Sequence, residues 1–351
     1  MRHQQGILLL TTLALASSAL AQSSLVLPAG YEYAWGRTSS AALGGPSTRT
    51  QMIFVNPFPA GTVITGIGLR PTTSIIDQPA FTATVEIRVS STSATPGALS
   101  STWGNNVGND EVVVLPQQTV TIPAMPANRG TGAFGDITFA TPFTFGLNGN
   151  TNICVDLLVY GLVGGSDWST DRAFAATSGR AANHGMGCNN ATVGSTSTNG
   201  TYVDGSTINF TVSGGPPSTL MLLALSVNQK EPAPGFPAPF PLSLIGAAPG
   251  CDLMVPLDIL QLAITDGAGA CASPLTISGL SQFGFGAQWL ALVPPTVPNP
   301  AGIETLRTRA VWIGPEPVAP NAGYVYHLSN VNSATGTATT NAAPVVKFSI
   351  L

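Results

Sequence analysis

Hydrophobic and polar residues alternate along many short stretches of this chain. In FTATVEIRVS (residues 81–90), the alanine, valine and isoleucine residues fall on one face of an extended backbone, and the threonines, Glu86 and Arg88 fall on the other. A period of two is typical of an antiparallel strand with one face in a core and one in water. The stretch therefore predicts a half-buried strand, with Glu86 and Arg88 side by side on its wet face.

The same pattern predicts strands through the first two hundred residues. Turn-forming pieces such as NPFPAG, TSATPG, NNVGND and LNGN separate these stretches. No window with a helical period and capping residues stands out. We expect an all-β protein whose N-terminal part is a two-sheet antiparallel sandwich, jelly-roll-like in type. Further strands are predicted at residues 51–55, 62–70, 118–122, 136–140, 152–160 and 206–212.

A proline-rich run, KEPAPGFPAPFP at residues 230–241, interrupts the strand pattern. Proline removes backbone donors and favours extended geometry, which is typical of linkers. We therefore expect an N-terminal domain over residues 22–229 and a smaller C-terminal β-sandwich over residues 242–351. Limited proteolysis is expected to cut first near Lys230.

The first 21 residues have the pattern of a signal peptide. Arg2 and His3 precede an apolar run from Ile7 to about Ala16, and Ala19-Leu20-Ala21 is a small-x-small cleavage signal. No later apolar stretch approaches the roughly 20 residues that a membrane-spanning helix needs. We expect a secreted or otherwise extracytoplasmic protein, cleaved near Ala21.

Few residues carry charge. Charged residues make up 8% of the chain, against about 25% in average domains. Removing residues 1–21 takes Arg2 from the 12 basic residues and leaves 11 against 16 acidic ones, a formal charge of −5. Nucleic-acid binding depends on Lys and Arg contacts to phosphate, so this balance argues against it.

Several segments carry a resemblance to a known group. IGAAPGCDLMVPLDI, DGAGACASPLTI, GFGAQWLAL and NPAGIETLRTRAVWIGP resemble the C-terminal module of uncharacterised secreted proteins of planctomycete-type bacteria, and TQMIF, TGIGLRP and ATPFTFGLNGNTNICVDL resemble their partner sandwich domain. The group carries no assigned activity. The resemblance therefore implies secretion and a two-domain β architecture, and it implies nothing about function.

Four cysteines remain after signal removal, an even number that is typical of disulfides in an exported protein. They allow three pairings. Because the proline-rich run falls between the second and the third cysteine, we expect each bridge to lie inside its own domain. The predicted bridges join Cys154 to Cys188 and Cys251 to Cys271.

The stretch NHGMGC, residues 183–188, places His184, Met186 and Cys188 on alternate residues. A blue-copper centre uses a thiolate, two imidazoles and a methionine. The only other histidine of the mature chain, His327, falls in the other predicted domain, and Cys188 is expected to be oxidised. We therefore predict a surface loop with no metal, and expect His184→Ala to leave any metal content unchanged.

No catalytic signature is present: GxSxG, HExxH and CxxC are all missing, and we assign no catalytic residue. SDWSTD offers Asp167 and Asp171 beside Trp168, a carboxylate pair next to an aromatic platform that could hold a sugar ring. The alternative is a solvated loop. These three residues are the candidate glycan-binding site.

Two oxygen-rich loops, residues 105–111 and 147–152, are candidates for calcium, although neither has a DxDxDG pattern. No other cofactor is expected. Two function classes remain. The first is a non-enzymatic secreted or cell-surface protein, structural, adhesive or glycan-binding. The second is a secreted polysaccharide hydrolase that uses a carboxylate pair.

Overall fold

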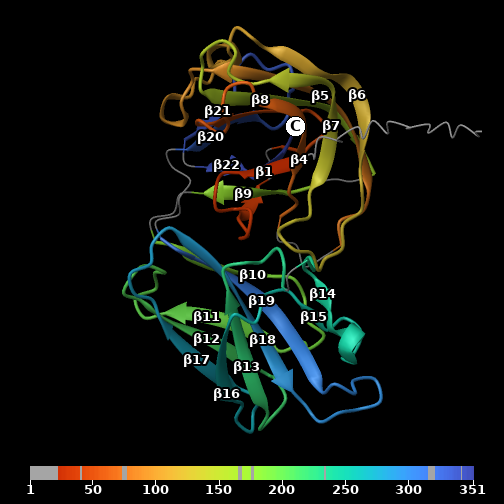
Figure 1. Cartoon of the computed structure of the whole chain (residues 1–351), viewed down its shortest axis with the longest axis vertical. Helices are drawn as coiled ribbons and strands as arrows, with labels where there is room; N and C mark the ends of the chain where they lie inside the picture. Colours follow the sequence, from red (N-terminus) through yellow and green to blue (C-terminus); the bar gives the residue numbers. More distant parts are fainter. Residues whose placement is uncertain are drawn as a thin grey trace, which may run out of the picture.

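The computed structural model describes residues 23–39, 42–72, 77–164, 168–174, 178–232, 235–314, 321–340 and 342–351. The protein is all-β and its sheets are antiparallel, as expected. Its strands form two bodies stacked one above the other, which we call the upper and the lower body (Figure 1). The helices among the described residues are three short 3-10 turns: Pro96–Ala98, Trp103–Asn106 and Leu242–Ile245.

The upper body is a sandwich of a six-stranded sheet, in the order β21-β20-β3-β8-β5-β6, and a four-stranded sheet, in the order β1-β23-β4-β7. A small sheet, β2-β9-β22, belongs to the same body. One core of aliphatic and aromatic side chains fills the space between the large sheets. The strands are β1 (Ser23–Leu27), β2 (Arg37–Ser39), β3 (Thr48–Phe54), β4 (Val63–Leu69), β5 (Phe81–Thr92), β6 (Val112–Ile122), β7 (Gly135–Thr144), β8 (Asn152–Val163), β9 (Thr170–Phe174), β20 (Ala322–His327), β21 (Thr337–Thr339), β22 (Ala342–Pro344) and β23 (Val346–Ile350).

The lower body is a smaller sandwich. A five-stranded sheet, β10-β19-β18-β13-β16, faces a three-stranded sheet, β11-β12-β17, across a second core. A two-stranded ribbon, β14-β15, and the turn at Leu242–Ile245 cover part of the outer face of the larger sheet. The strands are β10 (Arg180–His184), β11 (Thr192–Ser197), β12 (Thr207–Ser213), β13 (Leu220–Ser226), β14 (Phe240–Pro241), β15 (Asp252–Leu253), β16 (Ile259–Ile264), β17 (Cys271–Thr276), β18 (Phe283–Leu292) and β19 (Ile303–Ile313).

The strand pairing does not follow the predicted boundary at residues 230–241. The chain leaves the upper body after β9, builds the whole lower body from β10 to β19, and returns to pair β20 with β3 and β23 with β1 and β4. The segment that was expected to end the first domain is β13, an inner strand of the lower sheet. The division into residues 22–229 and 242–351 is therefore wrong. The lower body is an insertion between two parts of the upper one.

The proline-rich run is anchored rather than free. The Ala238 amide donates to the Lys230 carbonyl at 2.7 Å, and the Ala238 carbonyl accepts from the Gly130 amide of the upper body at 3.1 Å. The Lys230 ammonium lies 2.7 Å from the Glu32 carboxylate. These contacts tie the run to the upper body, and its last two residues, Phe240 and Pro241, pair with β15 of the lower body, so early cleavage at Lys230 is no longer expected.

Aromatic side chains join the two bodies. Trp312 of β19 stacks on Tyr31 of the upper body with ring centroids 4.7 Å apart, and its indole N–H donates to the Trp35 carbonyl at 2.8 Å. Both tryptophans are fully buried. Because such contacts exclude water and fix orientation, the two bodies meet in a packed joint.

The disulfide pairing also differs from the prediction. Cys188 and Cys251 form a bridge, and Cys154 and Cys271 are free thiols. The prediction placed Cys188 and Cys251 in separate domains, but both belong to the lower body. Cys154 lies in β8 of the upper body and Cys271 in β17 of the lower one, too distant in the fold to pair.

Candidate functional site

The candidate glycan-binding residues do not form an accessible site. Asp167 lies outside the described residues. Trp168 is buried, with its ring 5.6 Å from that of Phe81. Asp171 has no exposed surface and accepts from Arg70 at 2.8 Å and 2.5 Å and from the Gly36 amide at 2.9 Å. Trp168 and Asp171 are therefore not available to a sugar.

Arg70 and Asp171 instead form a buried ion pair beside the joint. The guanidinium of Arg70 also donates to the carbonyls of Tyr31, Ala34 and Thr131. Burial lowers the pKa of Arg70, and the neighbouring carboxylate opposes that shift. The ion pair holds in place the segment that carries Tyr31 and Ala34. Arg70 and Asp171 lie 101 residues apart in the sequence, so no local pattern could identify them as partners.

NHGMGC is not an exposed loop. His184 ends β10, is 1% exposed, and its Nε2 lies 2.9 Å from the Oε1 of Gln229. Burial lowers the pKa of His184 to about 3. The predicted surface position is wrong, because β10 pairs with β19 and carries the imidazole into the joint. With Cys188 in a disulfide, the motif lacks the thiolate that a blue-copper site requires.

The two calcium candidates lie side by side at one end of the upper body. The Asn148 amide donates to the Asn109 side-chain oxygen at 3.0 Å and to the Ser91 carbonyl at 2.9 Å, while Asp110 accepts from the Ser91 amide. The loops are thus joined by one direct hydrogen bond and by their shared contact with Ser91 of β5. No group of three or more acidic, histidine or cysteine side chains that could hold a metal occurs within the described ranges.

One cluster of charge stands out in this weakly charged protein. On the solvent side of the six-stranded sheet, Arg49 binds the buried Asp156 through two hydrogen bonds, at 3.1 Å and 2.6 Å, and Arg88 binds Glu86 at 2.6 Å. Partial burial raises the pKa of the adjacent Glu111, and the charge of Arg88 opposes that shift. Three carboxylates face two guanidiniums, so the cluster does not suit an anionic ligand.

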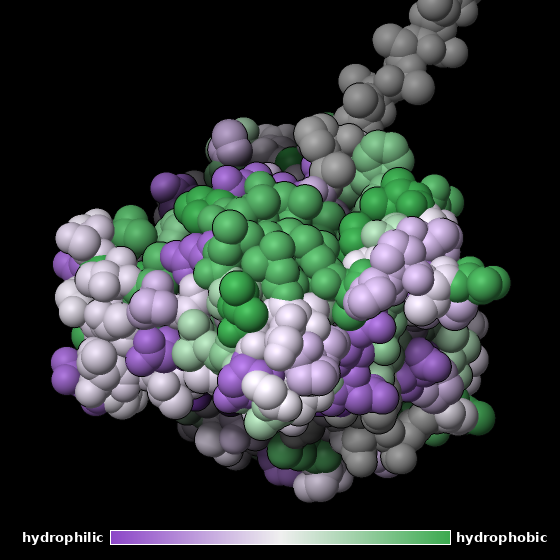
Figure 2. Space-filling model, turned by 90° about the horizontal axis from the view of Figure 1, so that it is seen from below, coloured by the Kyte–Doolittle hydropathy of each residue, from purple (hydrophilic) through white to green (hydrophobic). Residues whose placement is uncertain are grey.

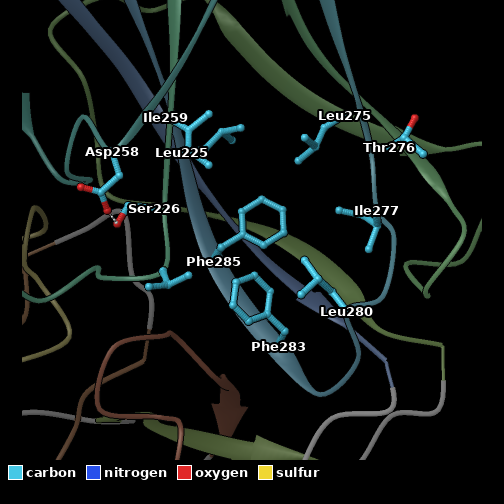
Figure 3. A pocket seen from close by; sticks show the side chains of 11 residues that line it. Leu225, Ser226, Asp258, Ile259, Leu275, Thr276, Ile277, Leu280, Phe283 and Phe285 are labelled. Atoms are coloured by element: carbon cyan, nitrogen blue, oxygen red, sulfur yellow. Dashed lines mark hydrogen bonds between the residues drawn. The ribbon is translucent and has the colours of Figure 1, made fainter.

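An exposed apolar area lies at the far end of the lower body, seen from below in Figure 2. A pocket of about 220 Å³ opens between the two sheets nearer the joint, where Phe283 of its wall lies across from Ile313, the neighbour of Trp312. Ile259 and Leu225 lie on one side, Leu275 and Ile277 on the other, and the two phenylalanine rings between them (Figure 3). The only charged side chain in its wall is Asp258, which accepts from the Ser226 hydroxyl at 2.5 Å. The pocket can therefore hold an aliphatic or aromatic group. Its walls are Leu225, Ser226, Val227, Asp258, Ile259, Leu275, Thr276, Ile277, Leu280, Phe283 and Phe285.

The apolar surface continues from the pocket onto the outer face of the larger sheet. Leu260, Leu262 and Ile264 of β16 are 48%, 68% and 70% exposed. Ile264 lies across from Leu220 of β13, which lies across from Leu292 of β18, and both of these leucines are exposed as well. We call these five side chains the apolar face. No motif in the sequence indicated a site at these residues.

Comparisons with known proteins add little. No protein-family model and no curated protein matches the chain. A solved structure of the infectious bursal disease virus Gt strain aligns over 94% of this chain and 81% of its own, at 10% identity and a TM-score of 0.15. A TM-score this low carries no argument. None of the helices within the described ranges is long and apolar enough to cross a membrane.

Proposed function

We propose that this chain is a non-enzymatic structural or adhesion protein that works outside the cytoplasm, and that it holds its partner through the apolar surface that runs along β16 of the lower body. The observation that carries the proposal is the pocket together with the apolar face. Apolar side chains that stay in water in a folded protein are typical of contact sites. The signal-peptide pattern and the resemblance to secreted proteins support the location.

The chemistry of the pocket supports binding rather than catalysis. Its wall is aliphatic and aromatic, and the Asp258 carboxylate at its rim is engaged by Ser226. General acid–base catalysis requires at least one titratable group positioned for proton transfer. A group that enters this pocket is expected to bind by burial of apolar surface.

A fluorescent apolar probe tests the proposal. With the secreted chain, residues 22–351, we expect saturable binding of 8-anilinonaphthalene-1-sulfonate. Leu280→Asp places a carboxylate at the pocket rim and should weaken binding about tenfold, the effect of roughly 1.4 kcal/mol. Leu147→Asp is the matched control, because Leu147 is an exposed leucine, 73% accessible, in the upper body. Absence of saturable binding, or equal losses in the two variants, would contradict the proposal.

A second candidate function is polysaccharide hydrolysis, and one observation favours it. Glu111 has a raised pKa, as a general acid requires, and lies among Arg49, Arg88 and Asp156. The test is release of reducing ends from a panel of polysaccharides by wild type and by Glu111→Gln. Hydrolysis that the substitution abolishes would replace the first proposal with this one.

A further inference from the structure

The edge strands of the described sheets differ in how they are protected against pairing with another chain. Proteins blunt edges with proline, charge, bulges or short strands. Most edges here carry such a feature: β1 is followed by Pro28, β2 and β21 have three residues each, β6 contains Pro116 and bulges, β7 contains Asp136 and Pro142, β10 contains Arg180, β17 contains Pro274 and β22 contains Pro344. The edge strand β11, TVGSTS, is polar and contains Gly194.

The edge strand β16 has none of these features. Its sequence is ILQLAI, and it pairs with β13 without a bulge. The neighbouring strands β13 and β18 also carry no charge. The flanking carboxylates are engaged locally, because Asp258 accepts from Ser226 and Asp266 accepts from the amides of Ala268 and Ala270. This edge is therefore open to another strand.

The backbone defines which groups of β16 are free. The Thr265 amide donates to the Thr219 carbonyl, so the odd-numbered residues of β16 point their N–H and C=O groups towards β13. The groups of Leu260, Leu262 and Ile264 then point to the open side. In an antiparallel pair with a second β16, Leu262 lies opposite itself, and Leu260 lies opposite Ile264. This register uses the free groups of all three residues and keeps their side chains on one face.

We propose that β16 pairs with β16 of a second copy about a two-fold axis at Leu262, which joins two five-stranded sheets into one of ten strands. The inference rests on the proposed function and names a second copy of this chain as the partner. An edge that is complementary to itself under a two-fold rotation is what an isologous interface requires. The three strands themselves carry no charge, and the flanking Asp258 and Asp266, which this register places opposite each other, are hydrogen-bonded within their own chain.

The available area agrees with a dimer. At roughly 100 Å² for a fully exposed Leu or Ile side chain, the apolar face leaves roughly 250 Å² in water. The exposed neighbours Val227, Leu257, Ile259 and Leu280 raise the apolar area to roughly 450 Å². Each partner in a standard interface buries about 800 Å², of which roughly 60% is apolar. The β16 side of the lower body therefore exposes about as much apolar surface as one partner of a stable dimer buries.

Sedimentation equilibrium of the secreted chain, residues 22–351, tests the pairing. We expect a dimer at about 1–100 µM protein. Leu262→Lys and Leu262→Glu each place like charges across the axis, and each should raise the dissociation constant at least about 100-fold. Because residue 262 faces itself, an equimolar mixture of the two variants should recover a dimer. The control Leu147→Lys, on the upper body, should remain dimeric.

Several results would overturn the inference: a monomeric wild type over that range, dimers that both variants leave intact, or a mixture that stays monomeric. A monomer that co-sediments with phosphatidylcholine vesicles, and loses this binding in Leu262→Lys, would indicate a lipid surface instead. The dye experiment separates the two proposals. Dye binding by a monomeric protein refutes the pairing alone, and a dimer that binds no dye refutes the pocket as a binding site.

Discussion

The buried imidazole of His184 should make the stability of this protein depend on pH. Its Nε2 donates to the Oε1 of Gln229 at 2.9 Å, and its Nδ1 has no hydrogen-bond partner within the described residues. Protonation would place a charge and an unpaired N–H donor in the joint, where the ring of Trp35 lies 5.7 Å away. Burial therefore holds the pKa of His184 at about 3 in the folded protein.

The sign and size of the effect follow from proton linkage. The unfolded chain protonates His184 near its ordinary pKa of about 6.5, and the folded protein resists protonation until about pH 3. Stability is therefore fully present above about pH 6.5 and falls by about 1.4 kcal/mol per pH unit below it. Between pH 7 and pH 4.5, this one residue should lower the free energy of unfolding by about 2.7 kcal/mol.

His184→Gln removes the titrating group and keeps a polar side chain near Gln229. Urea unfolding followed by tryptophan fluorescence, at several pH values from 7 to 4.5, gives the free energy of unfolding of both proteins. The difference between wild type and variant should shift by about 2.7 kcal/mol over this range, because all other groups titrate in both. A difference that stays constant with pH would refute the argument, since His184 would then titrate alike in the folded and unfolded states.

Two further variants test features of the fold that the sequence did not reveal. The Cys188–Cys251 bridge spans 63 residues, so the double variant Cys188→Ser/Cys251→Ser should lose about 4 kcal/mol of unfolding free energy. A variant as stable as the wild type would contradict this, because it would mean that removing the bridge does not raise the conformational entropy of the unfolded chain. Asp171→Asn leaves the buried Arg70 without a counter-charge and should cost about 3–5 kcal/mol in the same urea assay. A loss below about 1 kcal/mol would mean that Arg70 finds compensation elsewhere.

Local alternation predicted the strands because each period-two pattern is a property of a short segment. The stretch at residues 81–90 lies within β5, and Ala83, Val85, Ile87 and Val89 are all buried there. The predicted strand at residues 152–160 lies within β8 in the same way. The physical cause is that each inward side chain meets the core directly, whatever the rest of the chain does.

The domain boundary and the site depended on contacts between distant segments. The prolines at residues 230–241 do not separate two domains, because the insertion is defined by the pairing of β20 with β3 far along the chain. The wrong disulfide pairing followed from that boundary. Asp171 in SDWSTD resembled a surface ligand because its partner, Arg70, lies 101 residues earlier. No local signal connects these two residues.

The strand β16 shows how a local pattern and the fold can disagree. ILQLAI has apolar residues at both odd and even positions, a pattern typical of a strand with neighbours on both sides and cover on both faces. The fold places it at an edge, where Leu260, Leu262 and Ile264 remain in water. A single added strand would give β16 its second neighbour and would satisfy the backbone groups that now face solvent. Because a second copy brings a strand of the same pattern, self-pairing removes the disagreement for both chains at once.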